Sequence, residues 1–220
     1  MSNIKLKSSL YLIVVSSLII CYALARFSNL DLTVAKEFLG LIPKIVTYEL
    51  FIIGIFVKWG WKSRFFRNWL VPFPNLSGTW IGNIHSDWVN PETGDRVPPI
   101  PVMLTITQSF FMCNCVMHTG EMKSYSYSEG FNNDRDQQIN QVSYLYSSKP
   151  RICLRDRSVP HDGAIVFDII EKPVEKMIGR YWTERKTTGE IILSRYSKQV
   201  IEEFPIDFGL HPVTEPEKVH

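Results

Sequence analysis

The chain has 220 residues, 45% of them apolar, which is long enough for one packed domain with additional segments and excludes wholesale disorder. Its formal net charge of +2 hides an asymmetry, because residues 1–69 carry a net charge of +6 and residues 70–220 a net charge of −4. A domain with this acidic balance lacks the clustered basic face that binds a nucleic-acid backbone. We therefore expect no nucleic-acid polymer as a partner, and we assign the N-terminal positive charge to a membrane surface.

The first predicted element is a membrane-spanning helix at about residues 8–25, SSLYLIVVSSLIICYALA. This stretch is uncharged, it is flanked by Lys7 and Arg26, and its length is close to the ~20 residues that a spanning helix needs. A cleaved signal peptide is the alternative, but residues 26–37 offer no convincing small-residue cleavage site. We therefore expect an uncleaved anchor.

A second spanning helix is predicted at about residues 39–57, LGLIPKIVTYELFIIGIFV, where Pro43, Lys44 and Glu49 interrupt the apolar run. An ionisable side chain in hydrocarbon costs about 2.5 to 3.5 kcal/mol on insertion scales, so Glu49 should face the other helix, a protein partner or water. The alternative is a span that starts later, with Lys44 reaching the membrane surface and Glu49 within one turn of it.

Basic residues flank this pair of helices on both sides, whereas the linker between them has no net charge. The positive-inside rule therefore places the N-terminus and the large C-terminal domain in the cytoplasm, with a short hairpin loop outside, in a multi-pass membrane protein. After the second helix, basic and Trp residues alternate as at a membrane boundary, and Pro72 and Pro74 then prevent further helix. These boundary residues are Lys58, Trp59, Trp61, Lys62, Arg64, Arg67 and Trp69.

The chain is predicted to divide into a transmembrane hairpin with its basic segment (1–69), a cytosolic β domain (70–200) and a flexible tail (201–220). From residue 76 onward, apolar residues recur with period 2 between turn-forming residues. Eight or nine short antiparallel strands are expected, in a closed barrel or a sandwich. The candidate strands are 78–85, 102–108, 111–117, 123–128, 141–147, 151–155, 164–170, 175–183 and 190–196.

Alternation favours the barrel, because the predicted inner faces are not purely apolar. Gly179, Tyr181, Thr183 and Arg185 share one face of the seventh or eighth strand and its turn. A filled sandwich core would not place Arg in line with Tyr and Thr, whereas an eight-stranded barrel can leave room for one small ligand. The predicted fold is therefore two N-terminal transmembrane helices followed by an all-β, antiparallel, eight-stranded lipocalin-like barrel.

No motif asks for catalysis, so we predict a protein that is not an enzyme and needs no cofactor. The histidines lie far apart in sequence and none has a metal-ligand spacing; His161, in PHDG, is interpreted as part of a turn or as a ligand contact. Cys113 and Cys115 would share one face of a strand, and without a second Cys or His pair they favour strand-lining thiols over a zinc site. With Cys21 and Cys153 they are too few and scattered for a disulfide framework, and reduced cysteines suit a cytosolic domain.

In chain order, the sequence offers two transmembrane helices, a basic aromatic junction, PNLSGTWIG at 74–82, YLY at 144–146, HDG at 161–163 and GRYWTERKTTGEIILSR at 179–195. This order resembles the SMODS-associated two-transmembrane β-strand-rich effectors of bacterial CBASS, the cyclic-oligonucleotide-based antiphage signalling systems. The resemblance covers the chain to about Tyr196, and its most specific parts are the architecture and the 179–195 pattern. LSGTW-x-G alone would also suggest a lipocalin-like barrel.

The resemblance implies a function in abortive infection. A cyclic dinucleotide, made by a partner nucleotidyltransferase during phage infection, is expected to bind the barrel. The effector is then expected to oligomerise, so that its transmembrane segments disrupt the inner membrane and the infected cell dies. Glu49 would face its counterparts in that assembly.

The residues offer the chemistry that such a ligand needs, since forked Arg donors suit phosphates, aromatic rings suit bases, and hydroxyl or amide groups suit sugar and phosphate oxygens. The predicted ligand-binding residues are Gln108, Ser124, Ser126, Tyr144, Tyr146, His161, Tyr181, Thr183, Arg185 and Arg195.

Structural alternatives remain open for several of them. The tyrosines could fill the barrel core, Arg195 could cover Trp80 by a cation–π contact at the barrel end, and either the Ser124/Ser126 pair or the tyrosines between them faces inward. Gly78 and Trp80 are predicted to be structural. The alternative functions are a membrane-anchored lipocalin-like carrier or sensor of an apolar or lipid ligand, and a structural anchor with a filled barrel.

Overall fold

The computed structural model describes residues 6–66, 69–90, 93–134, 136–156, 158–170, 174–205, 208–209 and 211–212. The chain forms two compact units, Met1–Pro74 and Asn75–His220, each with its own packing. Arg67 of the predicted basic segment lies outside the described residues, as do 206–207, 210 and 213–220 of the predicted tail.

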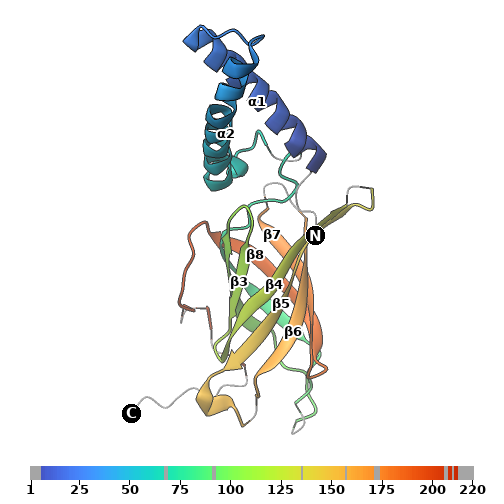
Figure 1. The fold of residues 1–220 in the computed structure, drawn as a ribbon. Helices are drawn as coiled ribbons and strands as arrows, with labels where there is room; N and C mark the ends of the chain where they lie inside the picture. Colours follow the sequence, from blue (N-terminus) through green and yellow to red (C-terminus); the bar gives the residue numbers. More distant parts are fainter. Residues whose placement is uncertain are drawn as a thin grey trace. The chain divides into compact units, whose positions relative to one another are not determined.

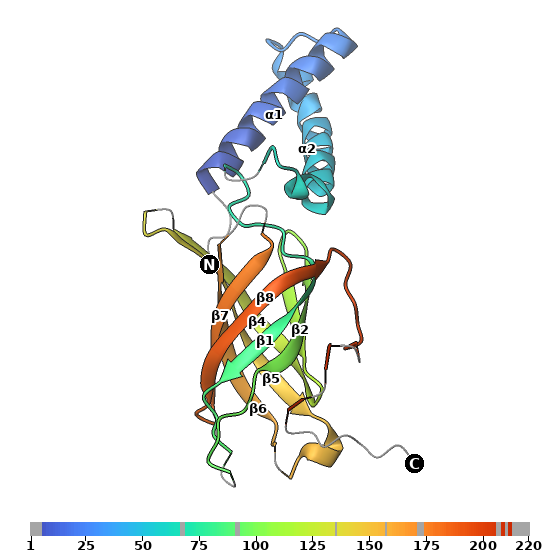
Figure 2. The same ribbon diagram turned by 180° about the vertical axis from the view of Figure 1, so that it is seen from behind.

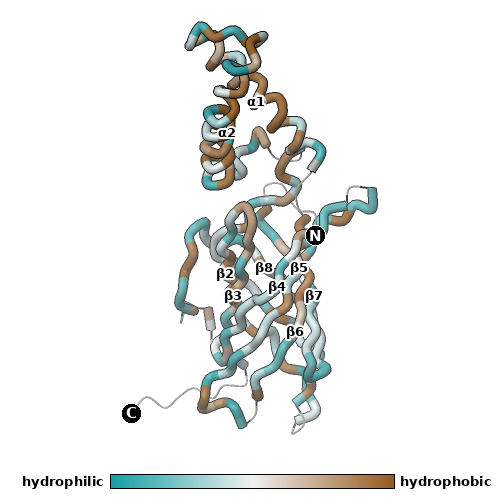
Figure 3. The backbone as a smooth tube through the Cα atoms, in the orientation of Figure 1, coloured by the Kyte–Doolittle hydropathy of each residue, from teal (hydrophilic) through white to brown (hydrophobic). Residues whose placement is uncertain are grey.

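The N-terminal unit contains two long helices, α1 (Leu6–Ser28) and α2 (Ala35–Lys58). Both are long and apolar enough to cross a membrane, and their hydrophobic character runs along most of their length (Figure 3). The two predicted helices are therefore confirmed, each a few residues longer than the apolar run that predicted it. Pro43 does not interrupt α2, which continues through it.

Glu49 lies in the middle of α2 and faces α1. Its side chain is almost buried, with 8% of its surface exposed, and its carboxylate accepts hydrogen bonds from the hydroxyls of Ser16 at 2.6 Å and Ser17 at 3.2 Å. The helix begins 14 residues before Glu49, at Ala35. These two hydroxyl donors offset the free-energy cost of burying the Glu49 carboxylate between the helices.

After α2 the chain turns back in a short 3₁₀ helix, η1 (Gly60–Lys62). Trp61 is buried, and its ring centroid lies 5.9 Å from that of Phe73. The ammonium groups of Lys58 and Lys62 lie 4.5 and 5.7 Å from the ring centroids of Trp59 and Trp61. The segment after α2 is therefore folded back onto itself by aromatic packing rather than extended.

The C-terminal unit is a closed barrel in which consecutive strands pair antiparallel and β1 pairs with β8 (Figures 1 and 2). This confirms the predicted fold class. The strands are β1 (Gly78–Ser86), β2 (Ile100–Gln108), β3 (Cys113–His118), β4 (Met122–Asp134), β5 (Ile139–Pro150), β6 (His161–Ile169), β7 (Lys176–Thr183) and β8 (Thr188–Ser197).

One predicted strand is wrong. Residues 151–155 contain a 3₁₀ helix, η2 (Ile152–Leu154), because β5 already has β4 and β6 as neighbours and a closed cylinder leaves no edge for a ninth strand. The other strands differ from the predicted bounds at their ends: β3 starts at Cys113 rather than at Phe111, β4 extends to Asp134, and β5 extends to Pro150.

One end of the barrel interior is plugged by Trp80. This side chain is fully buried and its indole N–H donates to the carbonyl of Leu76 at 3.0 Å. The guanidinium of Arg195 lies 4.1 Å from the Trp80 ring centroid and donates to the carbonyls of Val174 and Ser77, both at 3.0 Å. The sequence had left open whether Arg195 contacts Trp80 or a phosphate; the structure places it against Trp80.

Two further residues complete this closed end. Gln108 accepts a hydrogen bond from the backbone N–H of Leu76 at 2.7 Å, which fixes the chain where it enters the barrel. Gly78 has a φ of 126°, and an added Cβ there would collide with the carbonyl of Ser197, so a side chain is excluded by both conformation and space.

Replacing Arg195 should destabilise the barrel. Arg195→Leu removes two partly buried hydrogen bonds from a charged donor to backbone carbonyls, which predicts a loss of about 2 to 3 kcal/mol in the free energy of unfolding. Arg180→Leu is the matched control, since Arg180 is exposed on the neighbouring strand β7. Thermal unfolding of the full chain in detergent, followed by the β-sheet circular dichroism, measures both; equal shifts would contradict this role for Arg195.

Candidate functional site

A pocket of about 370 Å³ opens at the barrel end opposite Trp80. It is lined where β1, β3, β5 and β7 end and where β2, β4, β6 and β8 begin. Its lining includes Met117, Ile165 and Ile191 of the hydrophobic core, so the pocket is continuous with the packed interior. The remaining lining is mostly polar or aromatic: Ser86, Trp88, Thr119, Glu121, Ser124, Tyr146, Ser148, Ser158, His161, Tyr181, Thr183, Arg185, Thr187 and His211.

Arg185 is the cation that the tight turn between β7 and β8 places in this pocket. The turn is closed by the hydrogen bond from the N–H of Thr183 to the carbonyl of Thr187 at 3.0 Å, and the hydroxyls of the same two residues lie 2.8 Å apart. Among the described residues, the guanidinium donates one hydrogen bond, to the hydroxyl of Ser158 at 3.1 Å. Burial lowers the pKa of Arg185, and the guanidinium still remains charged at neutral pH.

Two tyrosines form aromatic walls beside Arg185. Tyr181 donates to the hydroxyl of Ser86 at 2.9 Å, and burial raises the pKa of its phenol. Burial likewise raises the pKa of Tyr146, with the neighbouring Tyr181 adding to the effect. A Cβ on Gly163 would lie 2.5 Å from the Tyr146 hydroxyl, so the glycine of HDG leaves the space that this ring occupies.

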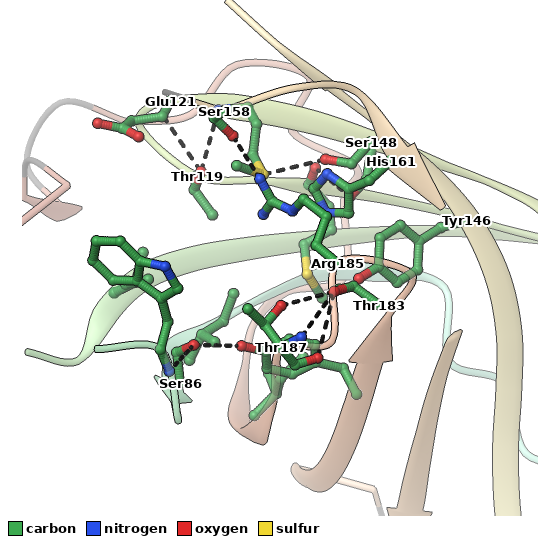
Figure 4. Close-up of a pocket in the computed structure, with 18 of the residues that line it drawn as sticks. Ser86, Thr119, Glu121, Tyr146, Ser148, Ser158, His161, Thr183, Arg185 and Thr187 are labelled. Carbon is green, nitrogen blue, oxygen red and sulfur yellow. Dashed lines mark hydrogen bonds between the residues drawn. The ribbon is translucent and has the colours of Figure 1, made fainter. Parts of the chain in front are cut away.

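His161 lies next to Arg185 and Tyr146 in the pocket (Figure 4). It is the first residue of β6, so the interpretation of PHDG as a turn is wrong at this position. Its Nδ1 lies 3.1 Å from the carbonyl of Val159 and therefore carries the proton. Burial lowers the pKa of the imidazole, so His161 is neutral at pH 7.

The structure brings six of the predicted ligand residues into this pocket. They are Ser124, Tyr146, His161, Tyr181, Thr183 and Arg185. The sequence had left open whether Ser124 or Tyr125 faces into the barrel. Ser124 is buried and Tyr125 is exposed, so Ser124 faces inward.

Four other predicted ligand residues do not line it. Arg195 and Gln108 lie at the closed end, where their polar groups bind protein carbonyl and amide groups. Tyr144 is buried in the core, 6.3 Å from the Phe167 ring centroid. Ser126 precedes an irregularity in the pairing of β4 and accepts a hydrogen bond from the N–H of Cys115 at 2.8 Å.

Several lining residues were missed by the sequence analysis. Ser148 could have been found, because it continues the alternation of Tyr144 and Tyr146 along β5. Nothing in the sequence pointed to Glu121 or His211, whose carboxylate and Nδ1 lie 3.4 Å apart and join the β3–β4 turn to the C-terminal segment. Ile201 donates to the hydroxyl of Thr79 at 2.9 Å, so the tail predicted to be flexible is held on the barrel at these two described points.

Comparison with known protein families decides what this barrel is. The model of the family described as Cap15, cyclic dinucleotide receptor domain, matches residues 71–195. The chain belongs to this family.

The Cap15 match covers every strand from β1 through most of β8 and ends at Arg195, so it includes the walls of the pocket except His211. It does not include α1 or α2. No curated protein matches the chain. The Cap15 domain is a cyclic dinucleotide receptor, which supports the family resemblance seen in the sequence and a sensing role in CBASS defence.

Tyr144 and Tyr181 should respond oppositely to loss of the hydroxyl group. The Tyr144 hydroxyl is buried without a hydrogen-bond partner among the described residues, so Tyr144→Phe should leave stability unchanged or raise it by about 1 kcal/mol. Tyr181→Phe loses the bond to Ser86 and should cost about 0.5 to 1.5 kcal/mol. Urea unfolding of the full chain compares the two, and a destabilised Tyr144→Phe would show that its hydroxyl has a partner.

Proposed function

We propose that a cyclic dinucleotide binds in the barrel pocket, and that the occupied barrels assemble so that the apolar helices disrupt the inner membrane and kill the infected cell. The observation that supports this proposal most directly is Arg185, a guanidinium that lines the pocket of a Cap15 receptor domain and has a single protein hydrogen bond among the described residues. The ligand would come from a partner nucleotidyltransferase, and the proposal includes no catalytic step.

The pocket chemistry matches the parts of such a ligand. The forked donors of Arg185 suit a phosphodiester, and the rings of Tyr146, Tyr181 and Trp88 suit stacked bases. Ser124, Ser148 and Thr183 add hydroxyl groups for phosphate or ribose oxygens. The volume of about 370 Å³ is within the range of small-ligand pockets.

The lipid-carrier alternative fits the pocket less well. It requires an apolar cavity with both arginines outside or at the closed end, and only Arg195 is at the closed end. Arg185 and the hydroxyl groups line the cavity instead, and a lipid chain would offer the charged guanidinium no further hydrogen-bond partner. The alternative with a filled barrel does not account for the cavity.

Membrane attachment through α1 and α2, with the N-terminus and barrel in the cytoplasm, completes the proposal. The basic flanks of the hairpin support this orientation, and it exposes the barrel to a cytosolic nucleotide. In a single chain Glu49 is bound by Ser16 and Ser17. In the proposed assembly, Glu49 of each copy leaves these hydroxyls and faces Glu49 of the other copies. This role would account for a polar group that is costly to place in a membrane.

Ligand binding can be tested by calorimetry of the full chain in detergent against a panel of cyclic di- and trinucleotides. At least one cyclic dinucleotide should bind, and Arg185→Ala should weaken its affinity about 10- to 100-fold through loss of charged hydrogen bonds. Arg180→Ala is the matched control, because Arg180 is exposed on β7, and this variant should bind the ligand with normal affinity. Absence of binding by every member would reject the proposal, whereas normal binding by Arg185→Ala would remove Arg185 from the site.

The killing step can be tested in cells that produce the ligand. Glu49→Leu should weaken toxicity because the membrane segment loses its one buried carboxylate among the described residues, and a chain lacking residues 1–58 should be harmless. Cell survival and dye entry across the inner membrane are the measurements. Full toxicity of both variants would show that the helices are not the lethal element.

A further inference from the structure

We propose that the turn between β2 and β3, residues 109–112, is a membrane-contacting tip that inserts its apolar side chains into the bilayer interface. This inference rests on the proposed membrane attachment of α1 and α2, and it adds a second, independent contact of the barrel with lipid. The tip is the sequence Ser-Phe-Phe-Met.

The side chains of this tip are unusual for a hairpin turn. Phe111 is 70% exposed and Met112 is 64% exposed, and the Phe110 and Phe111 rings pack edge to face with centroids 4.9 Å apart. Tight hairpin turns normally use Gly, Asn, Asp or Ser, which suit the backbone and water. Single exposed apolar residues need no explanation, but two consecutive ones on a turn, with the partly exposed Phe110 packed on Phe111, indicate a partner that is itself apolar.

The tip is held in place by its own backbone. The N–H of Ser109 donates to the carbonyl of Met112 at 2.8 Å, and the N–H of Met112 donates to the Ser109 hydroxyl at 3.0 Å. A preformed tip loses little conformational entropy on insertion, which favours binding to an interface.

The tip lies at the barrel end where the chain enters from the N-terminal unit. Gln108, the residue before the tip, accepts from the N–H of Leu76, and its own N–H lies 3.3 Å from the hydroxyl of Ser77. The barrel unit begins at Asn75, two residues after Phe73, which packs on Trp61 just beyond α2. Two residues span at most about 7 Å, so the covalent chain limits how far the start of the barrel can lie from the segment that follows α2.

Phenylalanine and methionine suit the lipid interface better than they suit a polar surface. Peripheral membrane segments insert Phe, Trp and Leu side chains to the level of the acyl boundary. The boundary residues Trp59, Lys58 and Lys62, which precede the barrel in the chain, have the aromatic and basic character of an interface anchor. The tether raises the effective concentration of the tip at the bilayer, so a small apolar surface is sufficient for contact.

Photo-crosslinking of the full chain in lipid nanodiscs tests the proposal. p-Benzoylphenylalanine replaces Phe111, and lipid adducts are quantified by mass spectrometry after irradiation. The matched control is the same replacement of Ile152, an apolar residue that is 81% exposed in η2 at the pocket end of the barrel. Phe111 should give a several-fold higher yield of lipid adducts than Ile152, and replacement of Met112 should agree with it.

A third probe separates this proposal from the proposed membrane attachment. Tyr11 of α1 is 71% exposed and should give lipid adducts if the helices are in the bilayer. If the probe at Tyr11 gives lipid adducts and the probe at Phe111 gives no more than the probe at Ile152, the membrane-contacting tip is rejected while membrane attachment of the helices stands. Adducts from Phe111 only to a second copy of the chain, or to another protein, would also overturn it. Absence of adducts from both Tyr11 and Phe111 would overturn membrane attachment and this inference together.

Discussion

The structure depends on how one end of a closed cylinder is filled. Trp80 occupies that end, and Arg195 covers its ring while its guanidinium binds two backbone carbonyls. Aliphatic residues of the core continue from this plug along the barrel axis, as far as Ile165 and Ile191. An eight-stranded barrel is only wide enough for its own side chains or one small ligand. Since large side chains fill the end at Trp80, the ligand pocket lies at the opposite end.

The barrel uses two inward-facing arginines for opposite purposes. Arg195 is stabilised by protein groups, so it contributes to folding and has little left to offer a ligand. Arg185 is held on a turn with one hydroxyl partner among the described residues and is partly desolvated. A cation that the protein neither exposes fully nor pairs with a carboxylate attracts an anion from solution, and a phosphodiester satisfies its geometry.

The fold could be predicted from the sequence because it follows from local patterns: two apolar runs and a series of period-2 strands. The site was predicted only in part. Alternation shows which residues face inward, but each strand crosses the whole barrel, so Arg185 and Arg195 share the inward orientation and still lie at opposite ends. Gln108, predicted as a ligand residue, lies at the closed end for the same reason. Glu121 and His211 meet only through tertiary packing, which no local pattern reports.

The pairing of β3 with β4 sets where this cylinder can open. These strands share three residue pairs, whereas β4 and β5 share twelve, and beside β3 the Ser126 hydroxyl replaces a backbone acceptor. Strand separation requires the breaking of the fewest ladder bonds here, so backbone amides along this line should be the first in the barrel to exchange with solvent. Met117 and Ser124 form one of the three pairs and both line the pocket, so this local opening would widen the entrance for a ligand.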